Sequence, residues 1–388
     1  MDFDFLVPVS DAVLAHSELL SDQTLGKKIK CHNKQTGFPD LEGVRLAIIG
    51  VLENRNDVNY KEQEIQLDEI RQALFRLYPG SWDTAIVDLG DIENGETVQD
   101  TYFAVKTVVE ALLKKDIIPI ILGGSQDLTY PNYRAYDGIL PMVNLVNVDC
   151  KFNLGNTSKP IKNDNFVGKI ILNEPHNLFN YTAIGYQTYF NSQEEKDLMD
   201  SLYFESYRLG ELYNNIALVE PVMRDANMVS IDLKSVQASE VGGGQHFSPN
   251  GLNGREICAI ARYAGISNKV SSFGVYEYET CKENKATAML VAQIIWYFTE
   301  GVNCRVKDED FTDEQSFQKF TTLTDSYELV FYKSNKTGRW WMEIPFLSNV
   351  NNKLKHHTLL PCMHQDYLDA LNDKVPERWY KAINKNSV

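Results

Sequence analysis

The stretch Val146-Asn147-Val148-Asp149-Cys150-Lys151-Phe152-Asn153-Leu154-Gly155 is an apolar run that ends in an acid, a base and a polar residue at alternate positions. In an extended segment this alternation places Asp149, Lys151 and Asn153 on one side. Buried parallel strands of α/β proteins end in this way, and ligands bind at their carboxyl ends. The stretch therefore predicts one strand of a parallel sheet, with a candidate site where the strand ends.

Apolar runs alternate with segments of helical periodicity on both sides of this stretch. Strands are expected at 44–51, 84–89, 117–122, 143–148, 169–172, 183–186, 216–219, 228–231 and 270–276. Helices are expected at 67–77, 97–112, 192–214, 254–263 and 286–298, with Thr97 as an N-cap and Ser192 and Glu195 as a capping box. The alternation predicts an α/β fold of three layers (αβα), in which helices cover both faces of a mostly parallel, doubly wound sheet.

The C-terminal part of the sequence breaks this rhythm. Residues 327–332 and 339–346 have the pattern of a hairpin, and 365–384 has that of a helix. We therefore expect an N-terminal segment (1–43), an α/β domain (44–300) and a C-terminal α+β extension (301–388). The aromatic residues of the extension suit either packing against the domain or a protein interface, and packing is favoured.

Composition excludes several classes of protein. The 388 residues carry a formal net charge of -15 and no sustained Lys/Arg run, which argues against nucleic acid or an anionic membrane as the partner. No apolar run is long enough to be inserted in a membrane. The acidic start, Met1-Asp2-Phe3-Asp4, is unlike a secretory signal, so we expect a cytoplasmic protein. Six scattered cysteines without a CxxC pair favour reduced thiols.

Four of the predicted strands end in polar residues. These ends are Gly123-Gly124-Ser125-Gln126-Asp127, Asp149-Cys150-Lys151-Phe152-Asn153, Ser230-Ile231-Asp232-Leu233-Lys234 and Tyr276-Glu277-Tyr278. In a parallel sheet all four carboxyl ends lie along one edge. Residues that are far apart in the sequence are therefore expected to converge on one pocket.

The order GGSQD, DCKFN, SIDLK and EYET resembles the GGxH, DxHxD, SxDxD and EYNP-like motifs of the ureohydrolases, which include arginase, agmatinase and formimidoylglutamase. Two further segments, 87–92 and 249–256, are similar to the DLGD strand end and the PGGLxxRE helix start of that family. The resemblance covers roughly residues 44–298 and implies an arginase-like fold. It also implies a site of two manganese ions that activate a bridging water.

This chain departs from the family at four ligand positions, where it has Gln126, Lys151, Asn153 and Lys234. The resemblance assigns Asp149 and Asp232 to the positions that bridge both metals, and Glu277 to a substrate-contacting glutamate. A protonated lysine has three donors and no lone pair, so it replaces the charge of a metal without binding one. We therefore expect that manganese is lost and that no cofactor is bound.

Buried carboxylates repel each other unless a cation lies between them. The sequence thus predicts an internal salt-bridge network in which Lys151 and Lys234 replace the metals, with Lys234 paired to Asp149 or Asp232. The sequence disfavours three alternatives: Asp127 as a ligand in a shifted register, Lys151 as a nucleophile, and Cys150 as a catalytic thiol. The Gly242-Gly243-Gly244 run lacks the GxxxxGK pattern, which favours a flexible loop at the pocket over a phosphate site.

The leading hypothesis is a catalytically inactive protein of ureohydrolase fold that acts as a binding or scaffold component. A protein partner of unknown identity is expected, with the C-terminal extension as the contact region. The resemblance also makes a homo-oligomer an expectation, since the family forms trimers and hexamers. The alternatives are a divergent amidine or guanidino hydrolase, or a small-molecule sensor that uses the same pocket.

Overall fold

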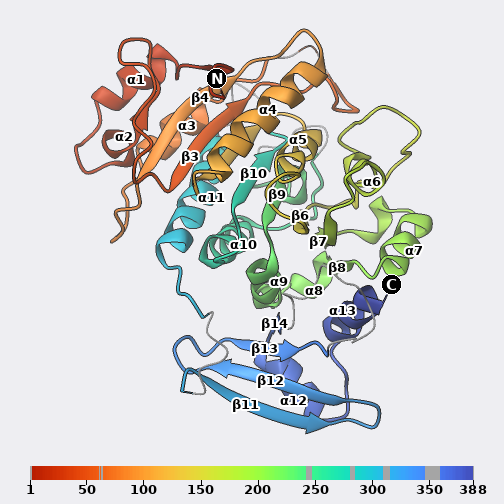
Figure 1. Cartoon of the computed structure of the whole chain (residues 1–388). Helices are drawn as coiled ribbons and strands as arrows, with labels where there is room; N and C mark the ends of the chain where they lie inside the picture. Colours follow the sequence, from red (N-terminus) through yellow and green to blue (C-terminus); the bar gives the residue numbers. More distant parts are fainter. Residues whose placement is uncertain are drawn as a thin grey trace.

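The computed structural model describes residues 2–60, 62, 64–241, 247–279, 285–308, 315–345 and 359–387. A large sheet crosses the α/β domain in the order β1-β4-β3-β5-β10-β9-β6-β7-β8, and β2 also pairs with β4 (Figure 1). Its strands are β1 (Leu6–Val7), β2 (Lys30–Cys31), β3 (Leu46–Val51), β4 (Ile86–Ile92), β5 (Ile118–Gly123), β6 (Val143–Val148), β7 (Leu178–Tyr186), β8 (Glu205–Arg208), β9 (Met228–Asp232) and β10 (Ser272–Tyr276). The described pairings are parallel except that of β1 with β4.

Helices cover both faces of this sheet. One face packs against α3 (Asp68–Phe75), α9 (Val219–Asp225), α10 (Gly254–Ile266) and α11 (Lys285–Asn303). The other packs against α4 (Val98–Leu113), α5 (Thr129–Arg134), α6 (Phe166–Leu172) and α7 (Gln193–Ser201). The strands β3, β5 and β6 are buried along their whole length because each is covered twice. The predicted three-layer α/β fold is confirmed.

The predicted helix starts are also confirmed. Thr97 and Asp100 form a capping box at α4, and Ser192 and Glu195 form one at α7. In both, the side chains satisfy amides that have no partner within the helix. The helix that begins after Ser192 ends at Ser201, however, and β8 follows it where the prediction continued the helix to residue 214.

Two predicted strands are wrong. Residues 169–172 belong to α6, in which Phe166, Val167 and Ile170 are buried at helical spacing. Residues 216–219 form the 3₁₀ turn η3 (Ile216–Leu218) and the start of α9. Both errors arose from apolar runs of three or four residues, which are too short for their period to separate helix from strand.

The N-terminal residues attach to the edge of the large sheet. Strand β1 pairs antiparallel with β4 and β2 pairs parallel with it, while α1 (Asp11–Glu18) and α2 (Leu25–Lys28) contact α3. These elements extend the sheet beyond β4. The boundary proposed at residue 43 remains a prediction.

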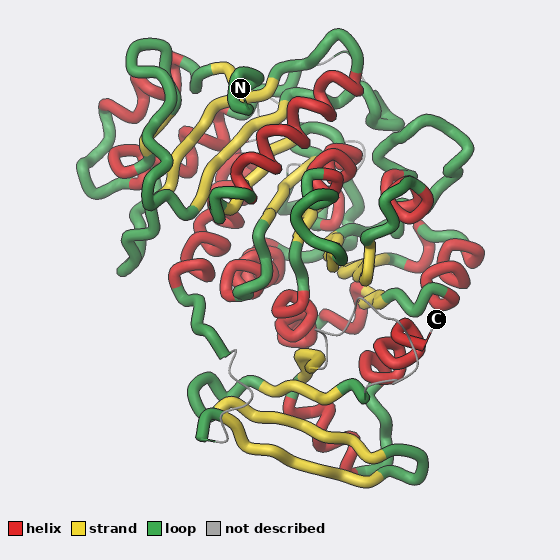
Figure 2. Tube along the Cα trace, viewed as in Figure 1, coloured by secondary structure: helices red, strands yellow, loops and turns green. Residues whose placement is uncertain are grey.

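The C-terminal part contains a second, antiparallel sheet (Figure 2). Its elements are β11 (Phe317–Leu323), β12 (Glu328–Ser334), β13 (Trp340–Glu343), β14 (Leu359–Cys362), α12 (His364–Leu371) and α13 (Glu377–Ser387). The predicted hairpin corresponds to β12 and β13, although its last residue, Phe346, lies outside the described residues. The predicted single helix is two helices, because Pro376 disfavours a helical conformation at the residue before it.

This C-terminal sheet has its own hydrophobic core. Phe331, Trp340 and Trp379 are buried in it together with Met342. Tyr327 and Tyr380, in contrast, are exposed. Packing therefore accounts for Phe331, Trp340 and Trp379, whereas the two tyrosines remain at the surface.

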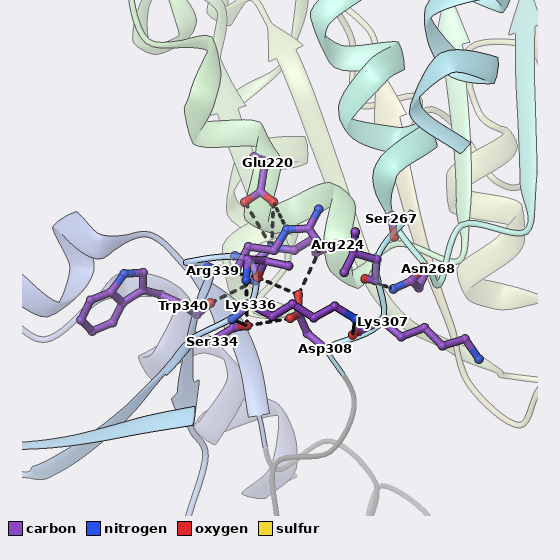
Figure 3. A network of polar contacts seen from close by, with 12 residues as sticks. Glu220, Arg224, Ser267, Asn268, Lys307, Asp308, Ser334, Lys336, Arg339 and Trp340 are labelled. Atoms are coloured by element: carbon purple, nitrogen blue, oxygen red, sulfur yellow. Dashed lines mark hydrogen bonds and ion pairs between the residues drawn. The ribbon is translucent and has the colours of Figure 1, made fainter. Parts of the chain in front are cut away.

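A buried arginine links the C-terminal sheet to the α/β domain (Figure 3). Arg224 of α9 donates to the carbonyl oxygen of Trp340 at 3.1 Å and to that of Cys362 at 2.9 Å. Its guanidinium lies 4.7 Å from the ring centroid of Trp341. Nearby, Arg339 approaches Glu220 of the domain at 3.5 Å. These contacts are mostly polar, as is usual between domains of one chain.

No helix among the described residues is long and apolar enough to cross a membrane. The five described cysteines are free thiols, and Cys281 lies outside the described residues. The glycine run 242–244 lies outside them too.

Candidate functional site

The candidate site lies at the carboxyl ends of four neighbouring strands, β5, β10, β9 and β6. Because these strands are parallel and adjacent, the residues that follow them meet at one edge. The structure brings together the side chains of Gln126, Asp149, Asn153, Asp232, Lys234 and Glu277.

The chain does not stay extended after β6. The strand ends at Val148, and Asn153 has a φ of 55°. The carboxylate of Asp149 accepts a hydrogen bond from the backbone N–H of Lys151 at 2.9 Å and another from the side chain of Asn153. The prediction that alternate residues share one side of an extended segment is therefore wrong. A turn closed by Asp149 brings Asn153 back to the site instead.

Lys151 is exposed, and its ammonium forms no ion pair with any residue in the described part of the chain. Burial raises the pKa of Asp149, while the hydrogen bonds from the Lys151 backbone and Asn153 and the charge of Lys151 oppose that rise. The prediction of a buried ammonium at position 151 is therefore wrong, because Lys151 is exposed beside a cavity that Asp149 and Asn153 also border.

An amide network forms one wall of the site. The side-chain nitrogen of Gln126 donates to Asn147 at 2.8 Å and to Ser230 at 3.3 Å, and the side-chain oxygen of Gln126 accepts from Asn153 at 3.0 Å. Gln126 and Asn153 are both buried. The amides at these two positions therefore satisfy each other, together with the carboxylate of Asp149.

Lys234 provides a partly buried cation. It lies in the 3₁₀ turn η4 (Leu233–Ser235), and its ammonium contacts the carboxylate of Glu277 and lies 3.6 Å from that of Asp57. The predicted pairing with Asp149 or Asp232 is wrong. Asp232 instead accepts from the backbone N–H of Lys234 at 2.6 Å. Burial acts to lower the pKa of Lys234, but Glu277, Asp232 and Asp57 outweigh it, so that the pKa is raised and the lysine stays charged.

Glu277 follows β10 in a left-handed conformation, with a φ of 64°. Its carboxylate accepts from the backbone N–H of Gln126 at 2.7 Å, from the side chain of Asn163 at 3.0 Å, and from Lys234. Burial raises the pKa of Glu277, and Lys234 acts against this. The side chain is therefore held by donors from three separate segments.

Sequence reasoning missed Asp57 and Asn163. Asp57 lies in the loop after β3, and Asn163 precedes α6 and donates to Asp57 at 3.0 Å. Both are polar residues in irregular segments, where no periodicity predicts the direction of a side chain. No signal in this sequence would have identified them.

A cavity of about 510 Å³ opens beside these residues. Asp149 and Asp232 contribute carboxylates to its wall, and Phe190 and Phe247 contribute aromatic rings. The pKa of Asp232 is raised by burial and by the charges of Asp149 and Glu277. The volume is in the range of small-molecule sites.

Two other candidates lie in the same region. Asp127 is buried and accepts a hydrogen bond from the hydroxyl of Tyr102, and burial raises its pKa to about 7. It does not line the cavity. The pKa of the Cys150 thiol is raised by burial and by Asp149 and Asp232, which disfavours a reactive thiolate.

The donor set does not fit a pair of manganese ions. The ammonium of Lys234 has no lone pair, and it lies among the carboxylates of Glu277 and Asp57. The acceptor oxygens of Gln126 and Asn153 stand where imidazole and carboxylate would be needed. Within the described residues, no group of three or more His, Cys, Asp or Glu side chains is placed to hold a metal.

Comparison with known proteins gave matches over most of the chain. The family model described as "Arginase family" matches residues 45–300. A formimidoylglutamase of Geobacillus sp. is 25% identical over 244 residues, which span 58% of this chain and 72% of that protein. An uncharacterised 32.2 kDa protein of Methanothermus fervidus is also 25% identical over 244 residues, covering 59% and 82% respectively.

Among solved structures, a formiminoglutamase of Trypanosoma cruzi with Mn²⁺ matches with a TM-score of 0.62 and 16% identity. The match covers 69% of this chain and 97% of that one. At this identity the likeness shows the fold, which agrees with the three layers described above.

Proposed function

Because this chain belongs to the arginase family, and because a lysine ammonium lies among the carboxylates of its site, we propose that it is a catalytically inactive member that acts by binding. Its relatives include proteins named as formimidoylglutamases. The proposal rests on one observation above all, the contact of Lys234 with Glu277 and Asp57.

The ammonium of Lys234 supplies the positive charge that these carboxylates require. Buried carboxylates without a cation would cost several kcal/mol, so a metal is needed at such a site only when no other cation is present. A divalent ion next to Lys234 would also be repelled by its charge. The neutral amides of Gln126 and Asn153 add no negative charge that could offset this repulsion.

The test is metal content together with turnover. We expect protein incubated with Mn²⁺ and then desalted to retain no stoichiometric manganese by elemental analysis. The same preparation should not hydrolyse formiminoglutamate, arginine or agmatine. A manganese-containing formiminoglutamase treated in parallel is the positive control. One or more tightly held ions per chain, or turnover of any of the three substrates, contradicts the proposal.

A second candidate function is that of a divergent amidine or guanidino hydrolase. The cavity favours it, because Asp149 and Asp232 both border an open volume large enough for a small substrate. Glu277 is less available, since Lys234 and two amide donors hold its carboxylate. Turnover of formiminoglutamate would support this candidate, and a thermal shift without turnover would support a sensor that uses the same cavity.

The proposed binding role assigns the contact with a protein partner to residues 301–388. Leu323, Tyr327 and Tyr380 of this part are exposed, although large apolar side chains are usually buried. We expect that changing Leu323 and Tyr380 to serine reduces recovery of the partner in a pull-down from the native cell. Phe103→Ser, an exposed site on α4, is the matched control. The proposal also includes a homo-oligomer of this chain. Light scattering tests it by measuring the mass of the protein in solution.

A further inference from the structure

A second cavity, of about 350 Å³, lies at the carboxyl ends of β7 and β8. Residues 186–189, which begin at the last residue of β7, line one part of it, and residues 208–210, 212 and 213 line another. Asn250, Gly251 and Glu256 complete it from the start of α10. It is separate from the first cavity, but the next residues along two of these segments, Phe190 and Pro249, border the first one. Ligands bind along this edge of parallel sheets.

Two opposite charges face this second cavity. The guanidinium of Arg208 is exposed and makes no hydrogen bond or ion pair with the residues that the structure describes. Glu256 uses one carboxylate oxygen to accept from the backbone N–H of Asn253 at 2.9 Å, which leaves its other oxygen available. Although both residues border the cavity, no ion pair joins them. Each charge is therefore available to a ligand.

Aromatic side chains form the rest of the wall. Tyr186 is buried, whereas Tyr189 is 62% exposed and Tyr213 is 72% exposed. Tyrosine offers a rigid apolar face with a polar tip, which suits contact with a flat or apolar group. Exposed tyrosines on both sides of a cavity are placed to enclose such a group.

The wall between them is fixed before any ligand arrives. Gln187 is buried. Its backbone N–H donates to the backbone carbonyl oxygen of Cys150 at 3.0 Å, and its side-chain nitrogen donates to the backbone carbonyl oxygen of Asn250 at 3.1 Å. A side chain at Gly251 would lie 2.5 Å from the backbone nitrogen of Gln237. The segments around the cavity therefore pack too closely to rearrange freely, and such preorganisation favours binding.

We propose that this second cavity binds a zwitterionic α-amino acid that has an aromatic or other large apolar side chain. Its carboxylate pairs with Arg208 and its ammonium with Glu256, and its side chain packs against Tyr189 and Tyr213. The two charges of the ligand match the two unpaired charges of the protein, and the tyrosines account for the preference for an apolar group.

The test is calorimetry of the full chain with four probes: L-phenylalanine, L-phenylalaninamide, N-acetyl-L-phenylalanine and glycine. We expect phenylalanine to bind, and each of the other three to bind at least about tenfold more weakly, because each lacks one of the three recognised groups. Arg208→Gln should reduce phenylalanine affinity to that of the amide without changing the affinity for the amide. Glu256→Gln should reduce the affinity for phenylalanine to the affinity that wild type has for N-acetyl-L-phenylalanine.

Two features of these variants keep the test specific. Glutamine at position 256 can still serve in the capping box, so α10 should keep its start. Arg255→Gln removes a neighbouring exposed arginine that does not border the cavity, and it should leave phenylalanine binding unchanged. The proposal is overturned if phenylalanine does not bind at millimolar concentration, or if Arg208→Gln binds it as wild type does. The proposal is also overturned if phenylalanine binding is weakened by Lys151→Gln, a change at the first cavity, and not by the changes at the second.

Discussion

Two cations of the α/β domain, one fully buried and one partly buried, face carboxylates in different ways. Arg71 of α3 donates to both oxygens of Asp88, at 2.8 and 3.2 Å, and to Asp91 at 3.0 Å. It also donates to the carbonyl oxygen of Gly90 at 3.1 Å, and no part of its side chain reaches solvent. Lys234 contacts Glu277 and Asp57 at the wall of the first cavity, and 13% of its side chain is exposed.

The difference lies in how completely each cation satisfies its surroundings. The planar guanidinium of Arg71 matches the carboxylate of Asp88 in a bidentate pair. Burial raises the pKa of Asp88, and Arg71 acts against that rise. Lys234 is a point charge, and Asp149 and Asp232 border the cavity beside it. The first arrangement needs nothing further from solution. The second keeps two carboxylates at an open site.

The comparison predicts the largest effect at Arg71. Arg71→Met should leave Asp88 buried and Asp91 partly buried without a cation, and should lower the free energy of unfolding by about 3–5 kcal/mol. Denaturant unfolding measures this. Arg71→Lys keeps the charge but loses the bidentate geometry. Its free energy of unfolding should therefore lie between those of Arg71→Met and wild type. A loss below about 1 kcal/mol for Arg71→Met would show that the carboxylates at strand β4 do not depend on the arginine.

Lys234→Met should lower the free energy of unfolding by less than Arg71→Met does, by about 1–3 kcal/mol. The reason is that water from the cavity can reach the carboxylates that have lost their cation. The folded-state pKa of Glu277 already lies above its ordinary value through burial, and loss of the ammonium raises it further. A carboxyl with a raised folded-state pKa destabilises the fold above that pKa and ceases to do so once it is protonated. The difference from wild type should therefore shrink as the pH falls from neutral into mild acid, where Glu277 becomes protonated.

The partner of Lys234 is tested by a double-mutant cycle. Glu277→Gln should recover part of the loss caused by Lys234→Met, because it removes the unpaired charge that the lysine contacts. Asp149→Asn is the matched control, since Asp149 forms no ion pair with Lys234, and it should recover less. Equal recovery by both variants would mean that the lysine neutralises the whole site rather than Glu277.

The sequence was sufficient to predict how the site is assembled. Gln126, Asp149 and Glu277 follow parallel strands, and Asp232 is the last residue of one. Parallel strands that neighbour each other bring such residues together. Strand β6 was predicted with its observed bounds because its apolar run is continuous and is followed by polar residues. The family resemblance, carried by the motifs at these strand ends, agrees with the family-model match to residues 45–300.

The contacts of the lysines could not be predicted, because they depend on local turns. The alternation that placed Lys151 beside Asp149 holds only while the backbone is extended, and the backbone turns after Val148. Lys234 lies in a 3₁₀ turn that directs it to Glu277 and to Asp57, a loop residue. Strand β8 was missed because it is only four residues long and has no periodicity of its own. The capping box at Ser192 predicted a helix that continued through it.

A third arginine divides its donors between a carboxylate and the backbone. Arg224 is nearly as buried as Arg71. It forms an ion pair with Glu220 of its own helix at 2.9 Å, and it donates to two backbone carbonyl oxygens of the C-terminal sheet. Arg224→Met should lower the free energy of unfolding by about 1–2 kcal/mol, because Glu220 is partly exposed and keeps Arg339 nearby, while the two carbonyl groups lose a donor. Hydrogen exchange should increase in β13 and β14 and not in β3 or β5. Unchanged exchange in β13 and β14 would show that other contacts fix this sheet.

The smallest effect is expected at Lys151, which differs from Lys234 in exposure rather than in charge. Its ammonium is exposed and forms no ion pair within the described residues, so Lys151→Gln should change the free energy of unfolding by less than about 0.5 kcal/mol. The pKa of Asp149 should rise slightly, since the charge of Lys151 helps to lower it. Denaturant unfolding at neutral pH and in mild acid measures both effects. A loss comparable to that of Lys234→Met would mean that Lys151 turns inward in solution and that the site holds two internal cations.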